Sequence, residues 1–262
     1  MKKSRLLLII CAIALLAPSC QKKLAPEQEV SAAFTIDMPQ TKALADGAEA
    51  TELFVRVFDA SHNFLFEQKS TKKDGGWKVE LKLVPGTYSF SFWAQSTKAD
   101  AFSFDGEFMS LTYSRMDMNS DSEDAFWASV ADKEVTAPFT ESVTLKRPFT
   151  LIQWVSNSFI DVSLTDATSS MTISGMMCTR LNLITGKRDE AARKAIFTPA
   201  PITDYTQGRM TIAAYTYVLV PEEGVEAATV DYSLTLGDGS TIEGSASNVP
   251  LEPNHRTTLK DY

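Results

Sequence analysis

The chain has 262 residues, a formal net charge of −8 and 44% apolar residues, which is enough material for one or two hydrophobic cores. The acidic balance argues against a surface that binds nucleic acid or anionic lipid headgroups, so we expect no nucleic-acid partner. Only three cysteines occur, at Cys11, Cys20 and Cys178. We therefore expect the fold to be stabilised by packing and not by disulfides.

The first nineteen residues have the three parts of a secretory signal. Lys2, Lys3 and Arg5 make a basic start, an apolar run extends from Leu6 to Ala17, and small residues lead to Cys20. As a helix, this run would cover roughly 18 Å, well short of the roughly 30 Å hydrocarbon layer of a bilayer. We therefore expect residues 1–19 to be a signal peptide that is cleaved, which would change the net charge to −11.

A cysteine directly after the small-residue site resembles the end of bacterial lipoprotein signals. The resemblance implies a diacylglyceryl thioether and an N-acyl chain, such as palmitate, on Cys20. Three acyl chains would hold the protein on a membrane without a spanning helix. The alternative is an ordinary signal peptide with a chance cysteine near its end. Residues 20–31 begin as a polar, proline-containing stretch and are predicted to be a lipidated tether.

Short alternating or apolar segments, separated by turn residues, then predict a series of β-strands. The first five are Ala33–Ile36, Leu53–Phe58, Phe64–Gln68, Trp77–Leu83 and Thr87–Trp93. In Trp77–Leu83 the apolar residues project to one face and the charged residues to the other, which is typical of an antiparallel sheet with one wet side. Thr87–Trp93 repeats this pattern. Because no long amphipathic helix is available to cover these faces, we expect a second sheet to pack on them.

Between Lys98 and Glu134 the alternation weakens, and we expect a long excursion from the first sandwich. The segment Asp117–Asp124 has carboxylates at alternate positions, as in a calcium loop. However, Ser122 and Ala128 occupy the positions where such a loop needs glycine and a bidentate glutamate. An acidic solvated loop is therefore favoured over calcium binding at 117–124, with a short helix capped by Ser120 or Ser122.

A second series of strands follows, and the step from Arg147 to Pro148 is the predicted domain boundary, between residues 32–147 and 148–262. The expected strands are Ser142–Leu145, Phe149–Val155, Val162–Leu164, Ser170–Ser174, Met177–Leu183, Arg209–Val220, Thr229–Leu236, Ser240–Ala246 and a final short strand within 254–259. The glycine-rich segment Leu236–Ser240 predicts a hairpin turn. Only Asp189–Ile196 favours a helix.

Few residues could support chemistry. The two histidines, His62 and His255, lie in predicted turns, and Cys178 lies among apolar residues and is expected to be buried. No nucleophile motif, Cys/His cluster or phosphate-binding loop appears. We therefore expect no enzymatic activity, no cofactor, no catalytic residue and no metal site.

Four aromatic residues lie in the less regular segment: Phe102, Phe104, Phe108 and Tyr113. If they are exposed together they could stack on sugar rings, and the chain would be a surface glycan-binding lipoprotein. If they are buried, they only complete the first core.

The chain also resembles the fimbrillin-like lipoproteins of the type V pilin group, from Gram-negative gut and oral bacteria. The residues that carry the resemblance are the lipidated start, Thr41-Lys42-Ala43, Pro85-Gly86-Thr87-Tyr88, Phe92-Trp93-Ala94, Asp124-Ala125-Phe126, Lys146-Arg147-Pro148-Phe149, Asn248-Val249-Pro250-Leu251 and Asn254-His255-Arg256-Thr257. This implies an all-β chain with two tandem transthyretin-like Greek-key β-sandwiches. It also implies a place at the outer membrane or in a fimbrium, with other fimbrial subunits or surface ligands as partners.

In that family an arginine-directed protease removes the first strand, and the open groove accepts a donor strand from the next subunit. Here no arginine lies between Cys20 and Arg56, and Arg56 falls inside a predicted strand. The chain given also extends only about six residues past Arg256. The sequence therefore favours a terminal, accessory or non-polymerising member, with Lys42 as an alternative cleavage point.

Overall fold

The computed structural model describes residues 28–38, 50–73, 76–156, 163–197, 199–202, 206–207 and 210–261. The predicted signal peptide, Cys20, most of the predicted tether and Lys42 lie outside these ranges. Within them the chain is all-β, as expected, with two short 3₁₀ helices. No helix in the described ranges is long and apolar enough to cross a membrane.

Most predicted strands are present in the predicted order with shifts at their ends, and the two predicted within 170–183 form one long strand. Up to the predicted boundary they are β1 (Val30–Asp37), β2 (Glu52–Asp59), β3 (Phe64–Thr71), β4 (Trp77–Leu83), β5 (Gly86–Gln95), β6 (Phe102–Asp105), β7 (Phe108–Leu111), β8 (Phe126–Val135) and β9 (Phe139–Thr144). The 3₁₀ helices η1 (Tyr113–Arg115) and η2 (Asp121–Glu123) lie between β7 and β8. Beyond the boundary are β10 (Phe149–Ser156), β11 (Thr168–Asn182), β12 (Arg188–Ile196), β13 (Ala200–Pro201), β14 (Thr206–Gln207), β15 (Met210–Leu219), β16 (Val225–Thr235), β17 (Thr241–Leu251) and β18 (Arg256–Asp261). Of these strands, β6, β7, β8, β12, β13 and β14 were not predicted as strands.

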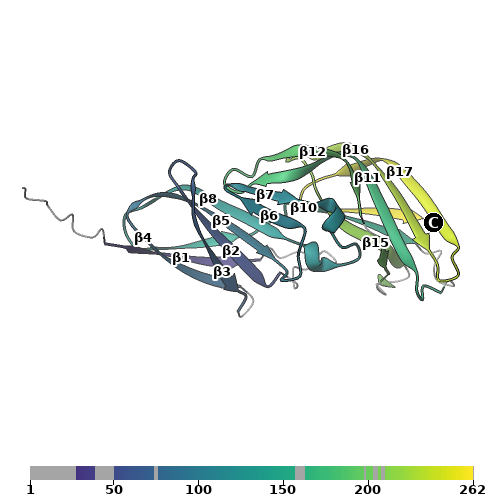
Figure 1. Cartoon of the computed structure of the whole chain (residues 1–262), viewed down its shortest axis with the longest axis horizontal. Helices are drawn as coiled ribbons and strands as arrows, with labels where there is room; N and C mark the ends of the chain where they lie inside the picture. Colours follow the sequence, from purple (N-terminus) through teal and green to yellow (C-terminus); the bar gives the residue numbers. More distant parts are fainter. Residues whose placement is uncertain are drawn as a thin grey trace, which may run out of the picture.

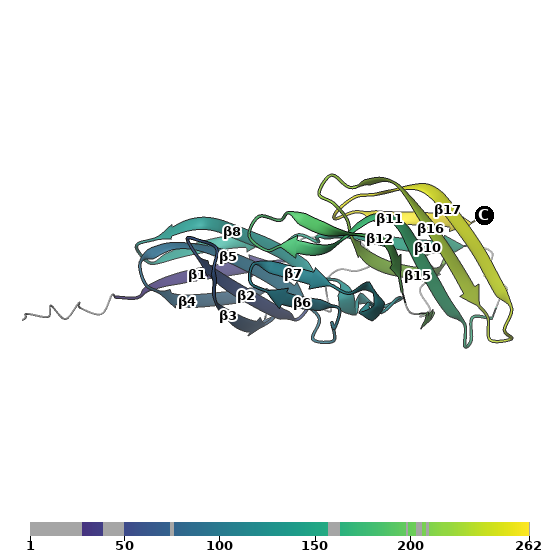
Figure 2. The same cartoon turned by 45° about the horizontal axis from the view of Figure 1, so that its top comes forward.

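These strands form four sheets along an elongated molecule (Figures 1 and 2). Near one end, the sheets β4-β1-β9 and β3-β2-β5-β8 enclose one cluster of buried side chains. Near the other, β14-β15-β10-β18 and β17-β16-β11-β7-β6 enclose a second, larger cluster, and β12 and β13 also pair with β11. The predicted covering of one sheet by another is therefore confirmed.

The alternation in β4 is confirmed: its apolar side chains are buried and Lys78, Glu80 and Lys82 are exposed. The next strand does not repeat this pattern, because both faces of β5 are buried along most of its length. Phe90 and Phe92 face the first cluster, while Trp93 belongs to the second. The prediction of a wet face on β5 was wrong, since the hairpin β6–β7 supplies aromatic rings that cover it.

The predicted excursion between Lys98 and Glu134 is built into the larger cluster instead of lying outside a sandwich. Strand β7 pairs with β11, with Ser110 opposite Arg180, and carries β6 as its hairpin partner. Residues Met109 to Ala125 include many buried members of the cluster that β10, β11 and β15 also form. The first half of the chain thus contributes side chains to both clusters, and the boundary at Arg147–Pro148 stays a prediction.

Two local predictions in the second half were wrong. Residues Asp189–Ile196 lie in strand β12, because pairing with β11 overrides the helix preference of alanine-rich sequence. Ser163 and Leu164 are not in a strand, and Val162 lies outside the described residues.

The predicted turn at Leu236–Ser240 joins β16 to β17, with the Leu236 N–H donating to the Ser240 carbonyl at 2.8 Å.

Candidate functional site

β1, the first strand in the described part of the chain, occupies the middle of a three-stranded sheet. β1 pairs antiparallel with β4, from Val30 opposite Leu83 to Ile36 opposite Trp77. On its other side it pairs parallel with β9, from Ala32 opposite Phe139 to Asp37 opposite Thr144. Both edges of β1 are therefore satisfied by strands that come much later in the chain.

The side chains of β1 fill the space between the two sheets. Ala32, Phe34 and Ile36 point inward and are at most 1% exposed. The ring of Phe34 lies with its centroid 4.9 Å from that of Phe90 and 5.0 Å from that of Phe92. If β1 left, a row of apolar hollows and two ladders of unpaired backbone groups, on β4 and β9, would remain. Such a slot is the template that another strand can complete.

Arg56 is shielded from proteases. Its side chain is 7% exposed, and its Nη1 donates to Glu67 Oε2 at 2.6 Å. Its Nη2 donates to the carbonyl of Gly106 at 3.2 Å, and its guanidinium lies 4.3 Å from the centre of the Phe64 ring. Because a protease must bind an extended, accessible backbone, this buried strand residue is a poor cleavage point.

Strand β3 carries an apolar edge. Among the described strands it pairs only with β2, so it ends its sheet. Phe64, Leu65 and Phe66 are three consecutive side chains that are 36–45% exposed. Exposed apolar residues on a strand whose outer edge is unpaired are a feature through which sheets join other chains.

The acidic stretch Asp117–Asp124 is not the solvated loop that was expected. Ser122, Glu123 and Asp124 are each at most 5% exposed. Asp124 forms an ion pair with Arg147, whose Nε and Nη2 donate to its two carboxylate oxygens at 2.5 and 2.8 Å. Burial alone would lower the pKa of Arg147, but the hydrogen bonds and charge of Asp124 outweigh it and raise that pKa. Two motifs that are 23 residues apart thus meet in one ion pair.

Two other carboxylates of this stretch, Asp121 and Glu123, are also partly or fully buried. Tyr217 donates its hydroxyl to Asp121 at 2.9 Å, and burial raises the pKa of Glu123 to about 7. Ser120 caps η2 as predicted, since its hydroxyl accepts from the Ser122 N–H at 3.1 Å. Within the described ranges, no three His, Cys, Asp or Glu side chains are grouped to hold a metal ion.

The remaining candidates for chemistry lie apart. His62 is exposed at the β2–β3 turn, with Nε2 3.3 Å from Asp132 Oδ1, and His255 is exposed, with Nδ1 2.9 Å from the Pro253 carbonyl. Cys178 is buried as predicted, and this burial raises its thiol pKa to about 11. Each histidine therefore has a carboxylate beside it, Asp132 for His62 and Glu252 for His255, whereas the raised pKa keeps the Cys178 thiol in its neutral, weakly nucleophilic form.

The four aromatic residues do not form an exposed platform. Phe102 packs against Trp93, with ring centroids 5.1 Å apart, and Phe104 lies 5.7 Å from Phe54. Arg180 covers the Phe108 ring at 3.6 Å, and the hydroxyl of the buried Tyr113 donates to the Cys178 carbonyl at 2.8 Å. Phe102, Phe104 and Tyr113 thus belong to or pack against the larger cluster, and not the first core as expected, so the four residues do not support sugar stacking.

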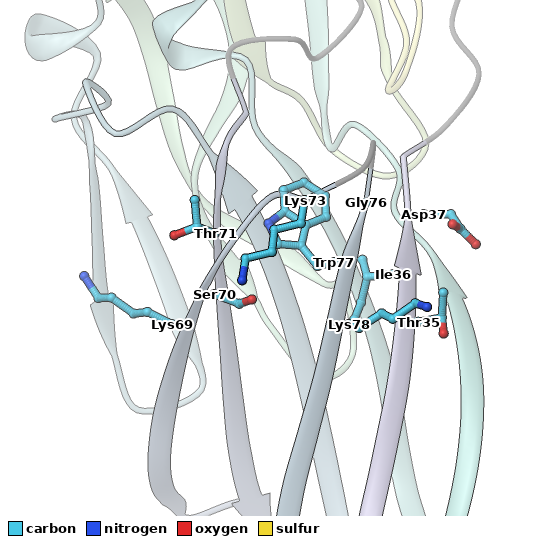
Figure 3. A pocket seen from close by; sticks show the side chains of 10 residues that line it. All are labelled: Thr35, Ile36, Asp37, Lys69, Ser70, Thr71, Lys73, Gly76, Trp77 and Lys78. Carbon is cyan, nitrogen blue, oxygen red and sulfur yellow. The ribbon is translucent and has the colours of Figure 1, made fainter.

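One cleft was not expected from the sequence. It has a volume of about 810 Å³ and opens between the ends of β1, β3 and β4 (Figure 3). Its lining includes Ser70, Thr71, Lys73 and Trp77. The sequence pattern places Trp77 in a core and the lysines on a surface, and the bridge between Lys73 and Gly76, at the connection from β3 to β4, brings Lys73 close to Trp77.

Comparisons with known proteins agree with this architecture. A family model described as a family of unknown function (DUF6562) matches residues 24–262. No curated protein matches the chain. A Bacteroides thetaiotaomicron structure, described as a candidate polysaccharide-binding protein (DUF1812), has a TM-score of 0.53 at 15% identity, covering 82% of this chain and 79% of that one.

Two other solved structures have a similar fold. A candidate adhesin from Bacteroides ovatus has a TM-score of 0.50 at 15% identity, covering 86% of this chain and 78% of that one. A fimbrilin (FimA) from Porphyromonas gingivalis has a TM-score of 0.50 at 14% identity, covering 85% and 82%. At these identities the similarity concerns the fold.

Proposed function

The chain belongs to the family of unknown function DUF6562, and we propose that it is a lipid-anchored cell-envelope protein of fimbrillin-like type. In this proposal it acts in fimbrial assembly or adhesion through strand edges and loops, and not through catalysis. Cys20 carries the lipid at the outer membrane, and the folded part consists of two tandem transthyretin-like β-sandwiches, from residues 32–147 and 148–262.

The observation that carries the proposal is the position of β1. β1 is the first of the described strands, yet it lies between β4 and β9, and it is connected to the strands that follow it through a single segment, residues 38–51. It can therefore leave or be replaced without unthreading any other strand. The slot offers backbone pairing on two sides and hollows for three apolar side chains, which gives both affinity and register.

The fold similarity to a fimbrilin and to candidate adhesins supports the same function without establishing it. The burial of Arg56 supports an accessory or terminal role over that of a repeating stalk subunit. No arginine lies between Cys20 and Arg56, so removal of β1 by an arginine-directed protease has no accessible site in this stretch. The protein would then keep β1 and its lipid together.

Capture of surface glycans is the second candidate. The fold is similar to that of a protein described as a candidate polysaccharide-binding protein. The four aromatic residues do not support this function, because they form no exposed platform. The cleft between the ends of β1, β3 and β4 does support it.

Mass spectrometry of the mature N-terminus, purified from the native cells, tests the anchor and the retention of β1 together. We expect the first residue to be Cys20, with a thioether-linked diacylglycerol and an N-acyl chain, and we expect residues 30–37 to be present. The Cys20→Ser variant should accumulate without lipid and be lost from the membrane fraction. A mature chain that begins after Lys42 would contradict the accessory role, and an unmodified Cys20 would contradict the anchor.

A further inference from the structure

We propose that the cleft between β3 and β4 binds the anionic group, carboxylate or sulfate, of an acidic polysaccharide. This inference rests on the cleft alone and does not require β1 to exchange. The cleft has the size of a small-molecule site, which is typically 300–1,000 Å³. It lies at the ends of β1 and β4, which belong to one sheet of the first cluster, and of β3, which belongs to the other; Figure 3 shows the side chains that line it.

A buried donor without a partner marks the cleft. Trp77 is 2% exposed, yet its indole Nε1 has no hydrogen-bond partner. The indole nitrogen can only donate, and an unpaired buried donor costs about 1–3 kcal/mol. In Figure 3 the nitrogen lies on the side of the ring toward Thr71 and Lys73. An acceptor atom supplied by a ligand would satisfy it.

The groups around this donor favour a negative ligand. Lys73 and Lys78 are exposed and line the cleft, and they outnumber the one carboxylate of the lining, Asp37. The ammonium of Lys72 lies 5.4 Å from the centre of the Trp77 ring. Ammonium groups and indole N–H groups are all donors, so a carboxylate or sulfate oxygen complements them better than a neutral acceptor does. This local positive charge departs from the chain as a whole, whose net charge is −8.

The rest of the lining favours a sugar over an acidic peptide. Ser70 and Thr71 add hydroxyl groups to the lining, and hydroxyl groups can both donate to and accept from sugar hydroxyls. Lys69 is not part of the proposed site, because its ammonium already lies 4.4 Å from the Phe54 ring centre and 3.9 Å from Glu52 Oε1.

Titration calorimetry with the purified protein tests the proposal. The probes are polygalacturonate oligomers, the same oligomers fully methyl-esterified, dextran sulfate and neutral dextran. We expect binding to at least one charged polymer, and at least a tenfold weaker Kd for its neutral counterpart. The comparison between polygalacturonate and dextran sulfate distinguishes carboxylate from sulfate.

Variants connect binding to the cleft. Lys73→Gln should weaken binding by about tenfold, the effect of losing one charge-assisted hydrogen bond of about 1.5 kcal/mol. Trp77→Phe, which keeps an aromatic side chain but replaces the indole with a smaller ring that has no N–H, should weaken it by about threefold or more. Lys187→Gln, which removes an exposed charge in the β11–β12 turn, should leave the Kd unchanged.

Several results would overturn the proposal. One is equal binding of charged and neutral polymers, and another is an equal loss from Lys73→Gln and Lys187→Gln, which would indicate a general charge effect. Binding of a glutamate-rich peptide, but of neither charged polymer, would exclude a polysaccharide ligand. Absence of binding by any probe at millimolar concentration would remove the site, while leaving the proposed function of the β1 slot intact.

Discussion

Replacing Asp124 with Asn is expected to destabilise the protein by about 3–5 kcal/mol, because it leaves the guanidinium of Arg147 buried without its counter-charge. Both side chains are at most 3% exposed, so water cannot replace the lost carboxylate. Urea unfolding, followed by tryptophan fluorescence, measures the change, and Trp127 lies close by in the chain.

The effect should be large because the ion pair lies where the two clusters meet. Asp124 precedes β8 and Arg147 precedes β10, and between them the backbones of Trp127 and Lys146 exchange hydrogen bonds of 2.8 and 2.9 Å. The indole of Trp127 donates to the Leu183 carbonyl at 3.0 Å. A Cβ on Gly186 would lie 2.7 Å from the Trp127 ring, so the β11–β12 turn packs tightly on β8.

A double-mutant cycle separates this ion pair from general damage. Arg147→Met should also be strongly destabilising, and the variant that combines it with Asp124→Asn should lose much less than the sum of both losses. Glu80→Gln is the control, because its ion pair with Lys82 has both partners more than half exposed, and its urea midpoint should not change measurably. An unchanged midpoint for Asp124→Asn would show that the pair does not stabilise the fold.

Phe34→Ala is expected to cost about 3–5 kcal/mol, the usual effect of removing a fully buried phenylalanine. The ring is 1% exposed and touches Phe90, Phe92 and Phe139, whose centroids lie 4.9 to 5.5 Å away. The cavity that this variant leaves lies between two sheets, each held in place by its other strands. The surrounding side chains should therefore fill the cavity only partly.

The neighbouring position provides a matched control. Ala33 lies on the same strand but points to the other face and is partly exposed, so Ala33→Ser should change the free energy of unfolding by less than about 0.5 kcal/mol. Both are measured by urea unfolding. A loss below about 1 kcal/mol for Phe34→Ala would mean that β1 contributes little to the first cluster, and would weaken the strand-slot account.

The strands themselves could largely be predicted from the sequence, because alternation is a local signal. β4 was predicted with its full bounds, since each of its seven side chains alternates between a buried and a charged, exposed position. The helix predicted at Asp189–Ile196 was wrong because the structure there is decided by pairing with a distant strand and not by a local signal. Local preference there favours a helix, and only the pairing with β11, which no local pattern reveals, imposes a strand.

The partners of the strands could not be predicted. The pairing of β1 with β9 joins residues more than 100 positions apart, and nothing in either segment specifies the other. The Asp124–Arg147 ion pair could not be predicted either. Each residue was assigned by its local sequence, Asp124 to a solvated acidic loop and Arg147 to a domain boundary, and neither pattern indicates the other. Likewise, the segment that holds Phe102, Phe104 and Phe108 looked irregular because its hairpin β6–β7 pairs with β11, a strand from the other half of the chain.

The central claim is that β1 occupies a slot between β4 and β9 that another strand can fill. The most direct test is whether a separate peptide with the β1 sequence can replace β1 there. A protease site placed at residues 41–47 allows the chain to be cut after folding, so that β1 is held only by its pairing with β4 and β9. A fluorescent peptide of residues 28–38 is then added, beside a control peptide with Phe34→Asp. We predict that the native peptide enters the cut protein and displaces β1, while the control peptide does not. A cut protein that stays folded, yet never takes up the native peptide, would contradict the account.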